Sequence, residues 1–477
     1  MLRLQPATRS RTCPPALLTI GAVIFCLSGP CARAQTAGPQ TSQLSPPVQL
    51  ERPSGPGGAS APITITLQDA LDRARQNDAQ YLLALTDARS AHEDRIQARA
   101  ALLPSVGFTT QELLTKGDGV LPSGRYVTND GVHVYRAWGV FHQDLSPNFF
   151  MLTGYRRASA AEALAQAKSE IAQRGLTVTV TMDYYALAVA QRKYATAQQS
   201  LDQAKRFLEI TQKLEHGGEA AHSDVIKAQL QFEQAGQAFQ QAGLMMEDAR
   251  LTLAVLLFPA FNENFSVVDD LDQAPPLVPF ADAQSMAQTA NPDLRAALAA
   301  MREANLDVSA ARASFLPSVT IDTDYGIEAN AFALASRPSV DPRAGRLPNL
   351  GHFVTASLVL PVWDWGALRS KLQQAELRRQ QSRVELSQTQ RQLLSNLYSL
   401  YNDAKVAQAA VDSLRRSTNL AAESLRLNTL RYQAGEATVL EVVDAQNVLT
   451  QARNAYDDGQ ARYRLALANL QTLTGRF

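Results

Sequence analysis

Residues 316–328 read LPSVTIDTDYGIE, and this stretch decides the fold. One side of the alternating run carries Val319, Ile321, Thr323, Tyr325 and Ile327. The other side carries Thr320, Asp322, Asp324 and Glu328. Successive side chains of a strand point to opposite faces of the sheet, and strands of about 10 residues with one apolar and one polar face are typical of transmembrane β-barrels. The stretch therefore predicts a membrane strand with its acidic face toward water and its apolar face toward lipid.

The segment before this strand occurs twice in the chain. Residues 98–106 read ARAALLPSV and residues 311–319 read ARASFLPSV, and the run Gly218-Glu219-Ala220 returns as Gly435-Glu436-Ala437. Matches in two separate blocks, in the same order, indicate a tandem duplication. We expect a first repeat over 63–279 and a second over 280–477. Each repeat reads as helix, strand, loop, strand, very long helix, tight turn and long helix.

The boundaries of these elements follow from breaker residues and periodicity. We expect helices near 67–103 and 281–316, polar loops near 114–131 and 330–350, return strands near 132–145 and 352–362, and long helices near 155–215 and 366–433. The first two helices end at a Leu-Pro pair because proline disfavours helix in the residue before it. Each long helix would measure about 90 Å at 1.5 Å per residue, a length that no compact globule requires.

The last helix of each repeat carries a seven-residue pattern. Its large residues are Val225, Phe232, Phe239, Met246 and Leu253 in the first repeat, and Val442, Leu449, Tyr456, Tyr463 and Leu470 in the second. A small residue follows three positions after each of the first four in both series: Ala228, Ala235, Ala242 and Ala249, and Ala445, Ala452, Gly459 and Ala466. A strict seven-residue repeat keeps one stripe facing a partner helix, which fits an ordinary antiparallel coiled coil or hairpins closed side by side into an α-barrel. The four strands favour the α-barrel, and because four strands cannot close a β-barrel in lipid, several copies must share one.

The first 34 residues differ from the rest. A positive start, an apolar stretch over 16–28 and Ala32-Arg33-Ala34 indicate a cleaved secretory signal peptide, with a lipid anchor on Cys31 as the alternative. All three cysteines (Cys13, Cys26 and Cys31) lie in this segment, so the mature chain would form no disulfide. Residues 35–62 are rich in proline, glycine and serine, and predict a disordered leader.

Composition and motifs exclude several classes of function. The 45 basic and 45 acidic side chains balance, which argues against a nucleic-acid partner. The sequence has no Walker loop, His-Glu-x-x-His motif, serine elbow or cysteine cluster, so we expect neither an enzyme nor a cofactor. His216 and His222 lie close together, but two histidines without a third ligand favour a solvated surface, and no metal site is predicted. Trp138, Trp363 and Trp365 lie near strand ends, either as an interfacial aromatic belt or as packing at the helix–strand joint.

The order of elements, together with PVWDWG at 361–366 and YQAGEATVLEVVDA at 432–445, resembles the TolC-like outer-membrane efflux proteins over 63–477. The resemblance implies a homotrimer in which each chain gives four strands to one barrel in outer-membrane lipid, above a helical tunnel through the periplasm. It implies a periplasmic adaptor protein and an inner-membrane transporter as partners. The expected function is the exit duct of a tripartite efflux pump or a type I secretion system.

The resemblance also implies a gate. The family's ring of acidic residues falls on Glu441 and Asp444, and its closing hydrogen bond falls on Asp224 and Tyr432. The family's gate arginine falls on Ala437, so that part of the lock is missing here. The hairpin tips that would meet the adaptor are Gly217, Gly218 and Glu219, and Ala434, Gly435 and Glu436.

Two other classes of protein share some of these features. A periplasmic coiled-coil adaptor of an export machine also has long hairpins and a signal peptide, but such adaptors lack two duplicated barrel hairpins. A structural filament protein would not need the interrupting strands.

Overall fold

The structure is a computed structural model that describes residues 63–114, 133–259, 264–329, 332–335 and 348–475. The expected signal peptide, Cys31, the leader and most of the two polar loops lie outside these ranges. Within the described residues, no helix has both the length and the apolar character needed to cross a membrane.

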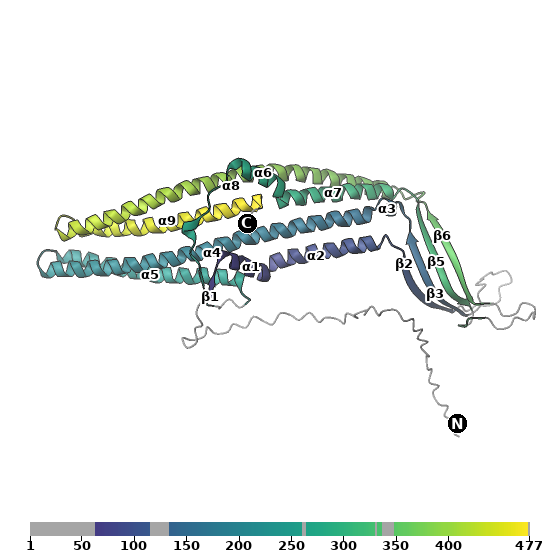
Figure 1. The fold of residues 1–477 in the computed structure, drawn as a ribbon, viewed down its shortest axis with the longest axis horizontal. Helices are drawn as coiled ribbons and strands as arrows, with labels where there is room; N and C mark the ends of the chain where they lie inside the picture. Colours follow the sequence, from purple (N-terminus) through teal and green to yellow (C-terminus); the bar gives the residue numbers. More distant parts are fainter. Residues whose placement is uncertain (1–62, 115–132, 260–263, 330–331, 336–347, 476–477) are drawn as a thin grey trace, which may run out of the picture. The chain divides into compact units, whose positions relative to one another are not determined.

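One order of elements occurs twice along the described chain (Figure 1). The first half contains β1 (Ile63–Ile65), α1 (Leu67–Asn77), α2 (Ala79–Ala100), β2 (Ser105–Leu114), β3 (His133–Asp144), α3 (Pro147–Phe150), α4 (Thr153–His216), α5 (His222–Leu257) and β4 (Phe265–Val267). The second contains the 3-10 turn η1 (Leu271–Gln273), α6 (Phe280–Ala290), α7 (Pro292–Ala313), β5 (Ser318–Ala329), β6 (Leu350–Val359), α8 (Ala367–Gln433) and α9 (Val439–Thr474). Corresponding helices have matching lengths: 22 residues in α2 and α7, and 36 in α5 and α9. The chain is thus mainly helical and repeated, as expected from its sequence.

The prediction of one continuous helix at the start of each repeat was wrong. The first helix breaks at Asp78, whose carboxylate accepts a hydrogen bond from the N–H of Tyr81 at 2.6 Å. The second breaks at Asn291, which accepts from the N–H of Leu294 at 2.9 Å, and Pro292 follows it at the first helical position. A capping residue must leave the helical conformation, and proline at this position has no N–H to lose. The capping signals outweighed the periodic pattern.

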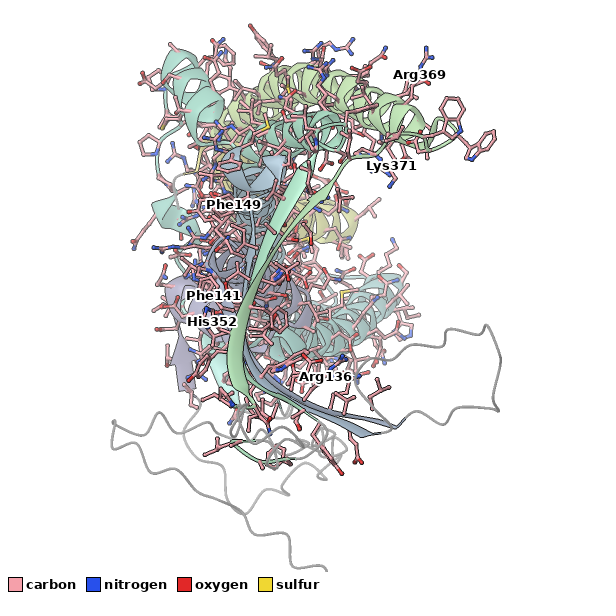
Figure 2. All side chains as sticks on the ribbon, turned by 90° about the vertical axis from the view of Figure 1, so that its right-hand side faces the viewer. Arg136, Phe141, Phe149, His352, Arg369 and Lys371 are labelled. Atoms are coloured by element: carbon pink, nitrogen blue, oxygen red, sulfur yellow. The ribbon has the colours of Figure 1, made fainter. Side chains whose placement is uncertain are left out.

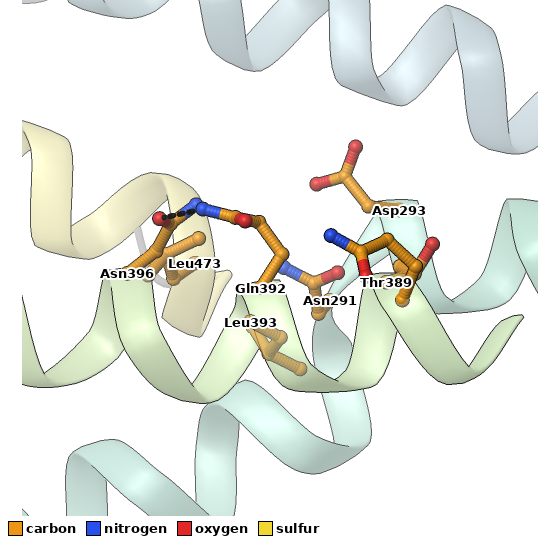
Figure 3. Close-up of a pocket in the computed structure, with 8 residues that line it drawn as sticks. Asn291, Asp293, Thr389, Gln392, Leu393, Asn396 and Leu473 are labelled. Atoms are coloured by element: carbon orange, nitrogen blue, oxygen red, sulfur yellow. Dashed lines mark hydrogen bonds between the residues drawn. The ribbon is translucent and has the colours of Figure 1, made fainter. Parts of the chain in front are cut away.

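Asn291 also lines a cavity of about 320 Å³ at this break. Figure 3 shows Asn291 and Asp293 opposite Thr389, Gln392 and Asn396 of α8. The Asn291 amide nitrogen is buried and has no hydrogen-bond partner among the described residues. The cap therefore fixes the orientation of this amide: its oxygen accepts from the N–H of Leu294, and its nitrogen is left without a partner among the described residues.

Four strands form one antiparallel sheet in the order β2-β3-β5-β6. The register aligns Val106, Phe141, Thr323 and Val354 across the four strands in one row. The polar rows contain ion pairs between the repeats, Arg136 with Glu328 at 2.9 Å and His142 with Asp322 at 2.5 Å. The alternation predicted for 319–328 is therefore confirmed, and each of its two faces continues over all four strands.

The outer strands of this sheet are β2 and β6. Neither pairs with a further strand among the described residues. Large apolar side chains on both edge strands are exposed, among them Phe108 and Leu358. An unpaired and apolar edge is a template for another strand, so the chain alone leaves the sheet unfinished.

The long helices lie side by side in one layer. Near the sheet the order of contacts is α2, α4, α7, α8, and toward the helical turns it is α5, α4, α9, α8. The predicted seven-residue stripes face these contacts: Leu253 of α5 and Val442, Leu449 and Leu470 of α9 are buried. A second stripe on α8, which includes Leu377, Val384, Leu420 and Leu427, is exposed at the edge of the layer. Leu377 and Val384 are seven residues apart, and so are Leu420 and Leu427, as in a coiled-coil seam, but no helix of the described chain covers them.

A polar network, which the sequence did not reveal, joins the two halves at the middle of the helices. The segment between β4 and α6 crosses from the first half to the second and is called the crossover here. Arg192 of α4 donates to Asp269 and Asp272 of the crossover at 2.8 Å each, and to Asp457 of α9 at 3.2 Å. Burial opposes the charge of Arg192, but hydrogen bonds to the three carboxylates outweigh it and raise its pKa. Beside it, burial raises the pKa of Tyr184 to about 12, so this hydroxyl stays protonated and donates to the carbonyl of Val268 at 2.7 Å. The network fixes the crossover against both halves.

The close approach of β3 and β5 generates a prediction about Gly326. A Cβ at this position would lie 2.0 Å from the carbonyl oxygen of Ala137 and 2.8 Å from the Cα of Trp138, both of them backbone atoms. We expect Gly326→Ala to destabilise the sheet by about 1–3 kcal/mol, the usual cost of overpacking, measured by thermal unfolding in detergent. Gly107→Ala in β2 is the matched control, because no atom lies within 4 Å of its added Cβ. Equal melting temperatures for the two variants would contradict the observed strand packing.

Candidate functional site

The two helical turns share one geometry. Gly218 and Gly435 both have φ of +75°. The N–H of Glu219 donates to the carbonyl of Leu214 at 2.8 Å, and the N–H of Glu436 donates to the carbonyl of Arg431 at 2.8 Å. This six-to-one bond around a left-handed residue is the Schellman end of a helix, which favours glycine. A helix therefore ends at each of the two predicted tips, with glycine at the left-handed position.

The helices that leave these turns begin differently. In α9 the N–H and hydroxyl of Thr438 donate to the carboxylate of Glu441 at 3.2 and 3.1 Å, and the N–H of Glu441 returns a bond to Thr438. This is a capping box. The guanidinium of Arg431 lies 3.5 Å from the same carboxylate and also donates to the carbonyl of Glu436 at 3.2 Å. In α5 the capping position is Ala221, which makes no side-chain bond.

These contacts separate the two carboxylates predicted for the ring. The backbone and side-chain hydrogen bonds from Thr438, with the charge of Arg431, lower the pKa of Glu441. That carboxylate is therefore ionised but engaged. Asp444 lies three residues further on the same helix and is exposed, with no hydrogen bond or ion pair to any described residue. Of the predicted pair, Asp444 alone is free to face a pore.

The predicted closing bond between Asp224 and Tyr432 is not formed in this structure. The Tyr432 hydroxyl is buried and has no hydrogen-bond partner within the described ranges. The Asp224 carboxylate instead lies 3.8 Å from the ammonium of Lys227. What the structure does bring together is apolar: the ring of Tyr432 lies on Phe207 of α4, with centroids 5.2 Å apart.

This ring contact belongs to a cluster that ties the two hairpins together. Its buried members are Phe207, Ala228, Tyr432, Val439 and Val442, one or two from each of the four long helices. Ala437, at the family's arginine position, packs against the same cluster. Apolar packing thus occupies the position where the resemblance implies an ion pair, and Arg431 lies against Glu441 instead.

The two histidines near the first tip have local partners. A ring nitrogen of His222 lies 2.6 Å from the carboxylate of Glu215, and one of His216 lies 2.9 Å from the carbonyl of Gln212. No group of three metal-ligating side chains occurs in the part of the chain that the structure describes.

Comparisons with known proteins agree with this architecture. Residues 283–476 match the family described as outer membrane efflux protein. The chain is 26% identical over 463 residues to the pyoverdine export outer membrane protein OpmQ of Pseudomonas putida, covering 90% of this chain and 91% of that protein. It is 28% identical over 376 residues to protein CyaE of Bordetella pertussis, covering 75% and 73%. The outer membrane protein VceC of Vibrio cholerae has the same fold, with a TM-score of 0.71 at 20% identity over 86% of this chain and 96% of that one.

The packing of Tyr432 can be separated from any role of its hydroxyl. Tyr432→Phe should leave the contact between the hairpins unchanged or slightly stronger, because a buried hydroxyl without a partner costs roughly 1–3 kcal/mol. Tyr432→Ala should weaken the contact by about 3–5 kcal/mol, because it leaves a cavity beside Phe207. Hydrogen exchange over residues 425–445 measures both effects. If Tyr432→Phe opens the tip as much as Tyr432→Ala does, while Asp224→Ala has the same effect, the hydroxyl is bonded to Asp224 in solution.

Proposed function

We propose that this chain, a TolC-like outer membrane efflux protein, is the exit duct of a tripartite efflux pump or of a type I secretion system. It lies in the outer membrane and extends into the periplasm. The observation that carries the proposal is a four-stranded sheet with one apolar and one polar face, joined through two short segments to helices of 64 and 67 residues. Such helices span roughly 95–100 Å.

The duct would be built by three copies of the chain. The β2 edge of one copy would pair with the β6 edge of the next, which closes a twelve-stranded barrel and satisfies every strand in lipid. The exposed stripe of α8 would pack in the same way against α2 and α5 of the neighbouring copy. Both unfinished edges of the single chain support this arrangement.

The polar face of the sheet would then line water. Arg136, His142, Asp322 and Glu328 lie on this face and pair with one another across β3 and β5. The opposite face, with Phe141, Val354 and Leu358, would contact lipid. The assignment follows from the cost of placing charged side chains in hydrocarbon.

The helical turns would form the closed entrance and the docking surface. We assign the acidic ring to Asp444 of the three copies, with Glu441 holding the start of α9. The tips at 217–219 and 434–436 would meet a periplasmic adaptor, which connects the duct to an inner-membrane transporter. An adaptor identity for this chain itself is disfavoured by the duplicated strand hairpins.

The substrate could be a small molecule or a protein, because relatives of both kinds match over most of the chain. OpmQ is named for pyoverdine export, and AprF of Pseudomonas aeruginosa, 21% identical over 419 residues, for alkaline protease secretion. The duct itself supplies a water-lined path for either class.

Ion selectivity tests the duct and its gate together. In planar bilayers we expect a cation-selective conductance that trivalent cations block from the periplasmic side, because like charges gathered at a narrow axis attract counter-ions. Asp444→Asn should weaken both selectivity and block. Glu441→Gln is the matched control, since glutamine keeps the capping box, and its effect should be smaller. A larger effect from Glu441→Gln would reverse the assignment, and a folded trimer that never conducts would contradict the duct.

A further inference from the structure

Two short segments join the membrane strands to the long helices and carry exposed apolar side chains. The first elbow is Phe150, Met151 and Leu152, before α4, and the second elbow is residues 362–365, before α8. Trp363 and Trp365 of the second elbow are 75% and 89% exposed. The same kind of surface thus occurs at the equivalent place in both repeats.

Local interactions fix the backbone conformation of the elbows. Leu152 and Trp365 have φ of 52° and 55°, the only non-glycine residues with positive φ in the described chain. Such conformations persist only where the surroundings enforce them. In the second elbow the carboxylate of Asp364 accepts bonds from the N–H groups of Gly366 and Leu368 at 3.0 and 2.6 Å. The two indole rings contact each other edge to face, with centroids 5.6 Å apart, so they are held outward as a pair.

Both elbows lie close to the ends of strands, and the second is continuous with the lipid-facing side of the sheet. β6 ends at Val359, three residues before the second elbow, and β3 ends at Asp144, six residues before the first. The apolar row of β6 continues through Leu358 and Leu360, which are both exposed, to the second elbow. Tryptophan is enriched at the boundary between hydrocarbon and headgroups.

Unpaired cations follow each elbow within one or two turns. Arg156, Arg369 and Lys371 are exposed and have no ion-pair partner among the described residues. Figure 2 shows Arg369 and Lys371 at the start of α8. Nearby carboxylates are engaged: Asp307 pairs with Arg157 at 2.8 Å, and Asp144 accepts from the N–H of Ser146 at 2.7 Å. Asp144 and Asp364 bind backbone N–H groups and keep their charge, so the three unpaired cations exceed the nearby unpaired carboxylates and leave an excess of positive charge beside the exposed rings.

We propose that the elbows bind anionic phospholipid in the leaflet that faces the helices. The indoles and Phe150 lie among the acyl chains next to the headgroups. Arg156, Arg369 and Lys371 bind the phosphates and the anionic headgroups. The inference rests on the chain spanning the membrane as proposed above, and is independent of what it exports. It explains why strained, exposed rings and unpaired cations recur together at both strand ends.

The chain's three tryptophans allow a direct test. In the Trp138→Phe variant only the second elbow fluoresces. Purified protein is placed in bilayers of neutral phosphatidylcholine that contain, at equal mole fraction, either brominated phosphatidylglycerol or brominated phosphatidylcholine. We expect quenching by both lipids, with a preference for phosphatidylglycerol of roughly five-fold or more at low salt that falls as salt is raised.

Two variants identify the charges responsible. Arg369→Gln with Lys371→Gln should abolish the preference for phosphatidylglycerol and leave quenching by phosphatidylcholine intact. Lys405→Gln with Arg416→Gln makes the same change of charge farther along α8, where both side chains are exposed, and should change nothing. Equal quenching by the two lipids in the parent protein would overturn the anionic site, as would an unchanged preference in the first variant.

A further control separates this inference from the proposed function. Phe141→Trp, with the other three tryptophans replaced by phenylalanine, reports on the apolar face of the sheet. If that tryptophan is quenched but the elbow pair is not, the barrel is in the membrane and the elbows are covered by a neighbouring copy or lie in water. If neither is quenched, the membrane assignment of the sheet fails.

Discussion

The outer edges of β2 and β6 present backbone N–H and C=O groups that no strand of the described chain satisfies. In lipid each such group costs several kcal/mol, so a spanning sheet must close. Much of the rest follows from this constraint. The side of the sheet that faces lipid must be mainly apolar, and the face with the ion pairs must enclose water. The layer of long helices also ends at an open edge, where the stripe of α8 is exposed.

Because of the duplication, the inner edges of the two strand hairpins pair with each other, and only the outer edges of β2 and β6 remain open. The pairing of β3 with β5 joins the two repeats through Arg136–Glu328 and His142–Asp322. Further along, Arg192 holds the crossover between the repeats against α9, and the Tyr432 cluster joins the hairpins near their tips. The two repeats are therefore linked at three levels, by polar contacts in the sheet and at the middle of the helices, and by apolar packing near the turns. If the turns form the proposed entrance, apolar packing would let it open without breaking a buried ion pair.

The extent to which sequence predicted this structure depended on the range of each interaction. Alternation over 319–328, the seven-residue stripes and the glycines of the two turns are local patterns, and the structure has each of them. The breaks at Asp78 and Asn291 were also local, but their capping signals were overlooked beside a continuous helical pattern. The network of Arg192 with Asp457 joins residues 265 positions apart and leaves no periodic trace. In the predicted acidic ring, Glu441 and Asp444 look equivalent in sequence, and only the positions of Thr438 and Arg431 distinguish the carboxylate that has partners from the one that has none among the described residues.

The most direct test of the central claim is to link the two open edges of the sheet. All three native cysteines lie within residues 1–34, so replacing them with serine gives a thiol-free background without a change to any described residue. Cysteines replace Phe108 in β2 and, one at a time, His352, Val354 or Ala356 in β6, and oxidised membranes are analysed on denaturing gels. The account predicts that at least one pairing yields a covalently closed trimer that a reductant returns to monomer. Only monomers for every pairing, or an open ladder beyond the trimer, would contradict a barrel shared by three copies.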